Sequence, residues 1–294
     1  MTPAHPAREP QSGPNTISVI AHRGASEDAP EHTLAAYRKA IEDGADALEC
    51  DVRLTADGHL VCVHDWRVNR VSNGKGAVSA LELSDLAALD FGSWKDTRDA
   101  KGSGESPEWD PGERALLGDR TAPLEDRTSV LTLERLLELV ADAGRRVELA
   151  IETKHPTRWA GQVEERLLEL LHRFGLATPP RGESSAVRVM SFSARSLHRV
   201  NFGAPDIPTV YLMQFLSPRY RDGRLPTGTW IAGPSIRILR NHPEYVARAQ
   251  RAGHQVHVWT VDSATDVELC ERLGVDAVIT NRPRQVLSQL GRNA

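Results

Sequence analysis

The sequence predicts a single α/β domain, a TIM (β/α)8 barrel with a small insertion after its second strand. Two observations lead to this prediction. Short runs of β-branched and other apolar residues alternate along the chain with helical patterns, which is typical of a parallel sheet. Eight such units fill most of the 294 residues, and this number and length are usual for the barrel. An open, doubly wound sheet is the alternative, because it shows the same alternation.

Eight short apolar runs read as strands, at residues 17–24, 47–55, 147–154, 187–193, 209–214, 230–236, 255–262 and 276–281. Most are followed by a helical stripe; in the first, Leu34, Tyr37 and Ile41 share one face and Gly44 ends the pattern. Similar stripes mark residues 132–144, 163–175, 194–201, 243–253, 264–274 and 283–292, whereas residues 215–228 show no strong periodicity. A further β-rich run at 59–65, after the turn signal "ADG", predicts a hairpin partner for the second strand.

Two segments lie outside this alternation. Residues 66 to about 129 are charged and rich in Gly and Pro around one small helical pattern. A stretch this long within a compact domain predicts a functional insertion, which we expect to stand over one face of the barrel. Residues 1–15 are polar and Pro-rich, without the apolar core of a secretory signal, and predict a flexible tail. Residues 16–294 would then form one domain.

Composition narrows the possible functions. The 36 basic and 40 acidic residues give a net charge of −4, with no basic run, so we expect no nucleic-acid partner. No window approaches the roughly 18 apolar residues of a membrane span, so no integral membrane segment is expected. Three cysteines in a chain of this length favour a reducing compartment. A cytoplasmic location is the resulting prediction.

Carboxylates stand at the ends of two predicted strands, where the active sites of such barrels lie. Glu49 and Asp51 are two residues apart, so both side chains point to the same face of their strand. Glu152 ends the neighbouring strand and is the natural third member. Carboxylates this close repel one another unless a cation lies between them, and hard oxygen ligands suit Mg²⁺ or Ca²⁺. The alternative is a set of exposed carboxylates paired with nearby Arg or Lys.

Two histidines, His22 and His64, also end strand-like runs. Because imidazole titrates near neutral pH, the pair could divide acid and base work between them. Either histidine alone could equally be a hydrogen-bonded structural residue. Zinc ligation is a third interpretation, but the first strand lacks an H-x-H pair, and three carboxylates favour a harder ion than zinc.

Positive charge and one large aromatic residue complete this edge. Arg23 and Lys154 could bind phosphate oxygens or form salt bridges with Glu49 and Glu152. Trp259 ends a β-branched strand and could form a wall of the pocket. Cys50 should point to the helix-facing side and belong to the core.

These residues occur in a recognisable order. "AHRGASEDAPEHT", "ECDVRLTADGHLVCVHD", "AIETK", "VHVWTVD" and "GVDAVITNRP" together resemble the glycerophosphodiester phosphodiesterase family, over the chain from about residue 17 to 283. The resemblance implies a TIM barrel with a small insertion after the second strand. It also implies hydrolysis of a small glycerophosphodiester to glycerol 3-phosphate and an alcohol, with one divalent cation.

The resemblance also implies roles for individual residues: Glu49, Asp51 and Glu152 as metal ligands, His22 and His64 as the acid/base pair, and Arg23, Lys154, Glu31 and Trp259 as substrate-binding residues. Two positions depart from the family's pattern. His32 stands where the family commonly has Asn, which bears on the loop beside the site, and Asn281 stands where it often has Asp.

Two other functions compete with this one. A lysophospholipase D-type activity on a similar barrel would need an apolar groove, and the insertion here is polar. A non-catalytic barrel that binds phosphodiesters would have lost one of the reacting groups, but every expected group is present. The residues alone assign neither the attacking group, water or the glycerol 2-hydroxyl, nor the histidine that acts first as base.

Overall fold

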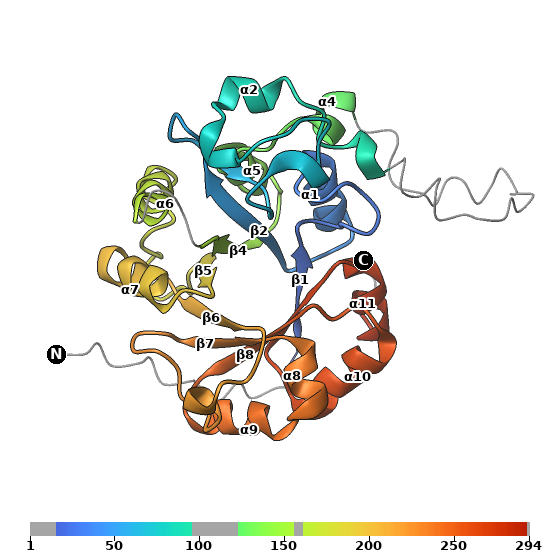
Figure 1. Cartoon of the computed structure of the whole chain (residues 1–294). Helices are drawn as coiled ribbons and strands as arrows, with labels where there is room; N and C mark the ends of the chain where they lie inside the picture. The colour runs from blue at the N-terminus through green and yellow to red at the C-terminus, as the bar shows by residue number, and fades with distance from the viewer. Residues whose placement is uncertain (1–15, 96–122, 156–160, 293–294) are drawn as a thin grey trace, which may run out of the picture.

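Eight parallel strands close into a barrel in the computed structural model, which describes residues 16–95, 123–155 and 161–292 (Figure 1). Strand β1 pairs in parallel with both β2 and β9, which joins the first strand to the last. The predicted TIM barrel is therefore confirmed and the open sheet is excluded. The barrel strands are β1 (Ser18–His22), β2 (Ala47–Leu54), β4 (Glu148–Thr153), β5 (Val187–Ser191), β6 (Thr209–Met213), β7 (Ile231–Pro234), β8 (Gln255–Trp259) and β9 (Ala277–Thr280).

Helices surround the barrel, and several start at a hydroxyl cap that the sequence supplies. Thr33 and Ser263, for example, each accept a hydrogen bond from a backbone N–H of the first turn. None of the helices in the described ranges is long and apolar enough to cross a membrane. They are α1 (Leu34–Glu42), α5 (Leu133–Ala141), α6 (Gln162–Arg173), α7 (Ala194–Gly203), α8 (Ile236–Asn241), α9 (Glu244–Arg251), α10 (Ala264–Leu273) and α11 (Pro283–Gln289).

One predicted strand runs into a helix that the sequence pattern did not predict. Residues 230–236 were expected to be extended, but β7 ends at Pro234 and α8 begins at Ile236. Ser235 has extended backbone angles and is the N-cap of this short helix. After β6, the described chain forms only a 3-10 turn, Pro218–Tyr220, in the segment that lacked helical periodicity.

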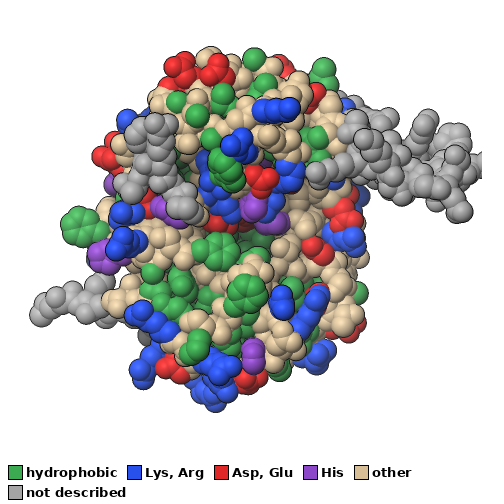
Figure 2. Space-filling view, viewed as in Figure 1, with side chains coloured by type: hydrophobic (Ala, Val, Ile, Leu, Met, Phe, Trp, Pro, Cys, Tyr) green, Lys and Arg blue, Asp and Glu red, His purple; other side chains and the backbone are tan. Residues whose placement is uncertain are grey.

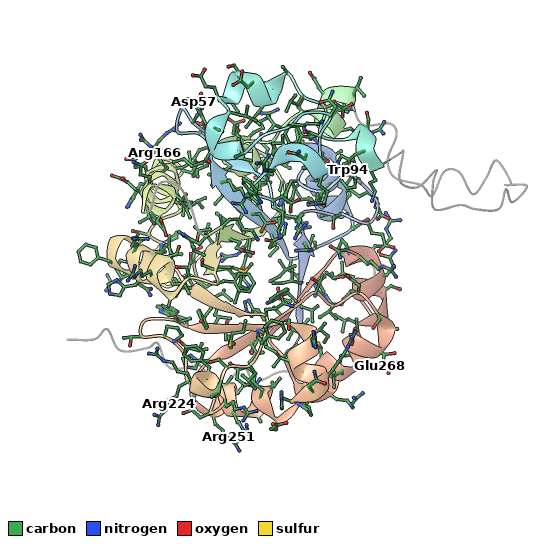
Figure 3. All side chains as sticks on the ribbon, in the orientation of Figure 1. Asp57, Trp94, Arg166, Arg224, Arg251 and Glu268 are labelled. Atoms are coloured by element: carbon green, nitrogen blue, oxygen red, sulfur yellow. The ribbon has the colours of Figure 1, made fainter. Side chains whose placement is uncertain are left out.

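A hairpin and a small folded segment follow β2. Strand β3 (Leu60–Cys62) pairs antiparallel with β2 outside the barrel, as predicted. The segment then forms two 3-10 turns, Val68–Arg70 and Val78–Ala80. Two short helices, α2 (Leu83–Ala87) and α4 (Leu124–Thr128), also belong to it. Asp57, in the hairpin turn, accepts from the first N–H of α2 and lies next to it in Figure 3. The small core of this segment is formed by Val61, Val63, Val68, Val71, Val78, Leu86 and Phe91. Residues 96–122, within the expected insertion, and the expected tail 1–15 lie outside the described residues.

Strand alternation separates the barrel interior from its outer layer. On β2, Leu48, Cys50 and Val52 pack against the helices, so Cys50 is a core residue as predicted. The alternate residues of the same strand, Ala47, Glu49 and Asp51, therefore face inward. Small and branched side chains fill the interior: Ile20, Ala47, Ala150, Met190, Val210, Leu212, Ile231, Ala277 and Ile279.

Gly24 supplies the turn that follows β1. Its φ is +83°, and a Cβ placed there would lie 2.6 Å from the Ala36 carbonyl carbon. We expect Gly24→Ala to lower the free energy of unfolding by about 2 kcal/mol or more, because backbone strain and a clash add together. Gly144→Ala is the matched control, because its φ is +68° but no atom lies within 4 Å of the added Cβ. Urea unfolding midpoints measure both, and equal losses would contradict the clash.

Candidate active site

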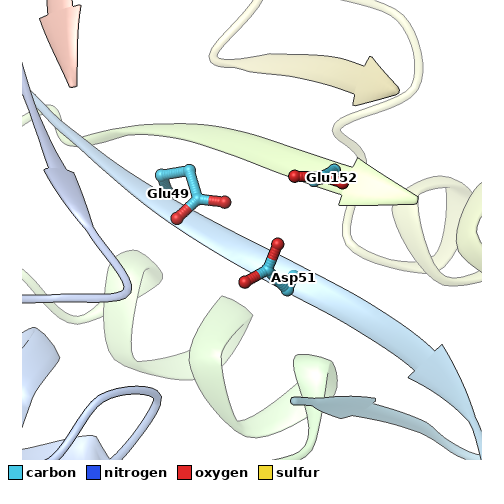
Figure 4. A group of neighbouring side chains, drawn as sticks. All are labelled: Glu49, Asp51 and Glu152. Atoms are coloured by element: carbon cyan, nitrogen blue, oxygen red, sulfur yellow. The ribbon is translucent and has the colours of Figure 1, made fainter. Parts of the chain in front are cut away.

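Register between neighbouring strands brings the predicted acidic residues together. His22 on β1 pairs with Glu49 on β2, and Asp51 pairs with Glu152 on β4. Glu49, Asp51 and Glu152 each offer an oxygen, and these oxygens all lie within 4.8 Å of one another (Figure 4). The three side chains are buried, so the alternative of exposed carboxylates is wrong. Three clustered carboxylates form the hard donor set that a divalent cation prefers, so the group could hold one.

Two basic side chains offset part of this negative charge. The Lys154 ammonium lies 3.0 Å from Asp51 Oδ1 and 2.8 Å from Glu152 Oε1. The Arg23 guanidinium Nε lies 3.1 Å from Asp51 Oδ2. Burial alone would raise the pKa of Asp51, but Lys154, His32 and Arg23 hold it well below its usual range. Asp51 is therefore ionised at neutral pH.

In the other two carboxyl groups, burial and repulsion favour the protonated form when no cation is bound. Burial, followed by repulsion from Asp51, raises the pKa of Glu49 well above its ordinary value. The same two causes raise the pKa of Glu152 to about 8. Binding of a cation would therefore release protons from this group, because carboxylate ligands must be deprotonated.

His22 is held by a chain of hydrogen bonds that crosses the barrel seam. Its Nδ1 lies 2.7 Å from Asn281 Oδ1, and the Asn281 amide in turn donates to Asp262 at 2.7 Å. Because a carboxylate can only accept, Asp262 fixes the amide orientation, so the Asn281 oxygen faces His22 and Nδ1 carries the proton. The remaining nitrogen, Nε2, lies 4.0 Å from Glu49 Oε2. Burial, followed by the charge of Arg23, lowers the pKa of His22 to about 3.

His64 follows the hairpin strand β3 and is more accessible, with 35% of its side chain exposed. Its Nδ1 donates to Asp65 at 2.7 Å, and Arg70 donates to the same carboxylate at 2.7 Å. Arg53 donates twice to the His64 carbonyl oxygen. Burial lowers the pKa of His64 below its ordinary value, while the charge of Asp51 and the Asp65 hydrogen bond oppose this shift.

Glu31 joins two arginines rather than facing the acidic group. One of its oxygens accepts from Arg23 at 3.0 Å, and both accept from Arg70. Arg23 itself has a left-handed backbone, with φ 59°, and its N–H donates to Glu49 Oε2 at 3.0 Å. Arg23 is therefore held both at its backbone N–H, by Glu49, and at its guanidinium, by Glu31.

Trp259, the last residue of β8, packs among the interior residues at this end of the barrel. Its indole N–H donates to the Gly233 carbonyl at 2.7 Å, and Phe192 meets its ring edge-on with centroids 5.5 Å apart. Figure 2 shows histidine, basic and acidic side chains gathered near the centre of the viewed face, with a band of hydrophobic side chains below them.

Sequence reasoning missed the part played by His32. This buried residue has φ 61°, and its Nε2 lies 2.9 Å from Asp51 Oδ2. Its Nδ1 lies 2.8 Å from the Tyr37 hydroxyl, which reaches the Glu49 carbonyl at 3.0 Å. The departure from Asn at this position was the available signal, and the contacts show that His32 ties the loop to β2.

Fold and site together define a (β/α)8-barrel protein with a buried acidic group and two histidines at one end of its strands. Residues 22–285 match the model of the glycerophosphoryl diester phosphodiesterase family. A protein of Mycobacterium tuberculosis named probable glycerophosphodiester phosphodiesterase 1 is 44% identical over 90% of this chain and 89% of its own length. A Bacillus subtilis protein named glycerophosphodiester phosphodiesterase is 32% identical over 92% and 85%. The chain therefore belongs to the glycerophosphodiester phosphodiesterase family of enzymes.

Solved structures show the same fold. A structure titled as a putative glycerophosphoryl diester phosphodiesterase from Silicibacter pomeroyi matches with a TM-score of 0.75 at 24% identity, over 95% of this chain and 94% of that one. A phosphodiesterase from Oleispira antarctica, in complex with the product sn-glycerol-3-phosphate, matches with a TM-score of 0.71 at 22% identity, over 94% and 97%.

His32→Ala tests the contacts by which His32 joins the loop after β1 to strand β2. We expect it to lower the free energy of unfolding by about 2 kcal/mol, because Asp51 and the Tyr37 hydroxyl each lose a buried partner. His32→Asn should cost less, because Asn tolerates a left-handed backbone and stays polar. Chemical denaturation measures both variants, and an equal loss for the two would show that backbone conformation at this position is unimportant.

Proposed function

We propose that this protein hydrolyses glycerophosphodiesters to glycerol 3-phosphate and an alcohol, using one divalent cation and two histidines. The observation that carries the proposal is the convergence of three buried carboxylates, His22 and His64 at one end of the barrel. The names of the related proteins and the glycerol 3-phosphate bound by the Oleispira protein support the choice of substrate.

In this proposal Glu49, Asp51 and Glu152 hold the cation, Mg²⁺ or Ca²⁺, which would offset negative charge on the phosphate and act as a Lewis acid. Arg23 and Lys154 bind phosphate oxygens. Nearby carboxylates raise the pKa of both, against the effect of burial, so both stay charged at neutral pH. Fixed cations of this kind stabilise the charge that develops on phosphate during transfer. Glu31 orients Arg23, and Trp259 forms one wall of the pocket.

His22 acts as the base. With its proton on Nδ1 and its pKa lowered to about 3, it is neutral at working pH and presents an unprotonated Nε2. The attacking hydroxyl, of water or of the glycerol itself, gives its proton to this nitrogen as it bonds to phosphorus. Because so low a pKa leaves its imidazole unprotonated at working pH, His22 carries no second proton to give at the start of the reaction, and the proton for the leaving alcohol comes from another group.

His64 supplies that second proton. Its Nδ1–H points at the Asp65 carboxylate, which favours the imidazolium form more than the neutral amide beside His22 does. As the phosphorus–oxygen bond to the alcohol breaks, the electron pair stays on the alcohol oxygen, which takes the proton from His64. When water attacks, the products are the free alcohol and glycerol 3-phosphate. When the glycerol hydroxyl attacks, the first products are the free alcohol and a cyclic phosphate diester, and water then opens this ring to give glycerol 3-phosphate.

Hydrolysis of glycerophosphocholine, followed as release of glycerol 3-phosphate, tests the activity. We expect a chelator to abolish turnover and added Mg²⁺ or Ca²⁺ to restore it, because the carboxylate group cannot bind phosphate oxygens by itself. Turnover that persists after thorough chelation would contradict the role of the metal.

A lysophospholipase D-type activity is the second candidate. Phe192 follows β5 and is 43% exposed, and Phe215 follows β6 and is 66% exposed. Both come after the carboxyl ends of their strands, as the loops around the acidic group do. Such aromatic side chains could meet an acyl chain. Faster turnover of a long-chain lysophosphatidylcholine than of glycerophosphocholine, in the same assay, would favour this activity.

The two histidines can be separated with a substrate whose leaving group needs no proton. We expect His22→Ala and His64→Ala each to lower kcat on glycerophosphocholine by about 100-fold or more. With glycerophospho-p-nitrophenol, whose leaving group is a weak base, His64→Ala should recover most of its rate and His22→Ala should not. Recovery by His22→Ala alone would reverse the two assignments, and near-native rates for either variant on glycerophosphocholine would make that histidine structural.

A further inference from the structure

A hollow of about 450 Å³ lies beside the acidic group, on the hairpin side. His64 and Lys154 line it and also border the acidic group, so the hollow opens directly from the candidate active site. The hollow is strongly biased in charge, because its lining has one carboxylate, Asp65, but four basic side chains: Arg53, Arg67, Arg70 and Lys154.

Two of these four cations are already paired. Arg70 donates to Glu31 and Asp65, and Lys154 lies against Asp51 and Glu152. The other two keep their charge available to a ligand. Arg53 donates only to a neutral acceptor, the His64 carbonyl, and Arg67 contacts the Trp66 ring and has no ion-pair partner among the residues that the structure describes.

Arg67 is also held in a way that suits anion binding. Its guanidinium carbon lies 4.3 Å from the centre of the Trp66 ring. This stacking uses the flat face of the guanidinium and leaves its N–H edge for a carboxylate or phosphate. It also covers one face of the indole with positive charge, so that face cannot receive the quaternary ammonium of choline.

We propose that this hollow receives the alcohol portion of the diester and favours alcohols that carry an anionic group, with Arg67 as the specificity-determining residue. The inference rests on the proposed function, in which His64 gives its proton to the leaving alcohol. An alcohol that departs beside His64 lies in the hollow that His64 lines. The group recognised is a carboxylate or a phosphate, since both match the edge of a guanidinium.

Glycerophosphoserine and glycerophosphoethanolamine form a matched pair of substrates, because the first differs from the second by one carboxylate. We expect kcat/KM to be about fivefold higher for the serine diester, as a charge pair near the protein surface allows. The advantage should shrink at high ionic strength. A second pair, glycerophosphoglycerol with and without a terminal phosphate, distinguishes carboxylate from phosphate as the preferred anion.

Arg67→Gln removes the charge from an exposed side chain. For each substrate pair, the ratio of kcat/KM for the more anionic diester to kcat/KM for its partner should then fall close to one. Arg251→Gln is the control, since Arg251 is also exposed but ends α9, across the barrel from the hairpin turn of Asp57 (Figure 3). The substrate ratio of this variant should equal that of the unmodified protein. A ratio near or below one in the unmodified protein, or one that survives in Arg67→Gln, would overturn this inference and leave the proposed function standing. If none of the four diesters is hydrolysed, the proposed function is overturned and this inference with it.

Discussion

The arrangement of this site depends on one constraint, the mutual repulsion among three buried carboxylates, which the surrounding groups must offset. Glu49, Asp51 and Glu152 come within 4.8 Å of one another inside the barrel, where water cannot screen them. Lys154 and Arg23 stabilise the charge of Asp51, while burial and repulsion from Asp51 raise the pKa of the other two carboxyl groups. A cation that entered this group would take the place of protons on those two carboxyl groups.

Supporting contacts carry this constraint outward through the loops. Glu31 lies between Arg23 and Arg70, so a residue of the segment after β3 helps to hold the loop after β1. Arg70 also holds Asp65, which contacts His64. Through Arg70, the segment after β3 therefore contacts both the loop after β1 that carries Arg23 and the Asp65 carboxylate beside His64.

The sequence was sufficient for the barrel and for the residues at its strand ends, because both depend on local periodicity. Inward-facing residues two apart on β2, such as Glu49 and Asp51, follow from strand geometry alone. The contacts of His32 and Asn281 do not follow from it. They depend on a left-handed loop residue in one case, and in the other on a hydrogen bond between residues 259 positions apart. Helix α8 was missed because its six residues are too few to show a period.

The hydrogen bond between His22 and Asn281 also makes the state of the His22 imidazole depend on closure of the barrel. His22 ends the first strand and Asn281 follows the last, and the two meet only where β1 and β9 pair. A growing chain emerging from the ribosome, or one cut short before β9, would lack the group that sets the proton on Nδ1. Protein synthesis would therefore yield a His22 imidazole with its proton fixed on Nδ1 only after residue 281 has been made and the seam of the barrel has closed.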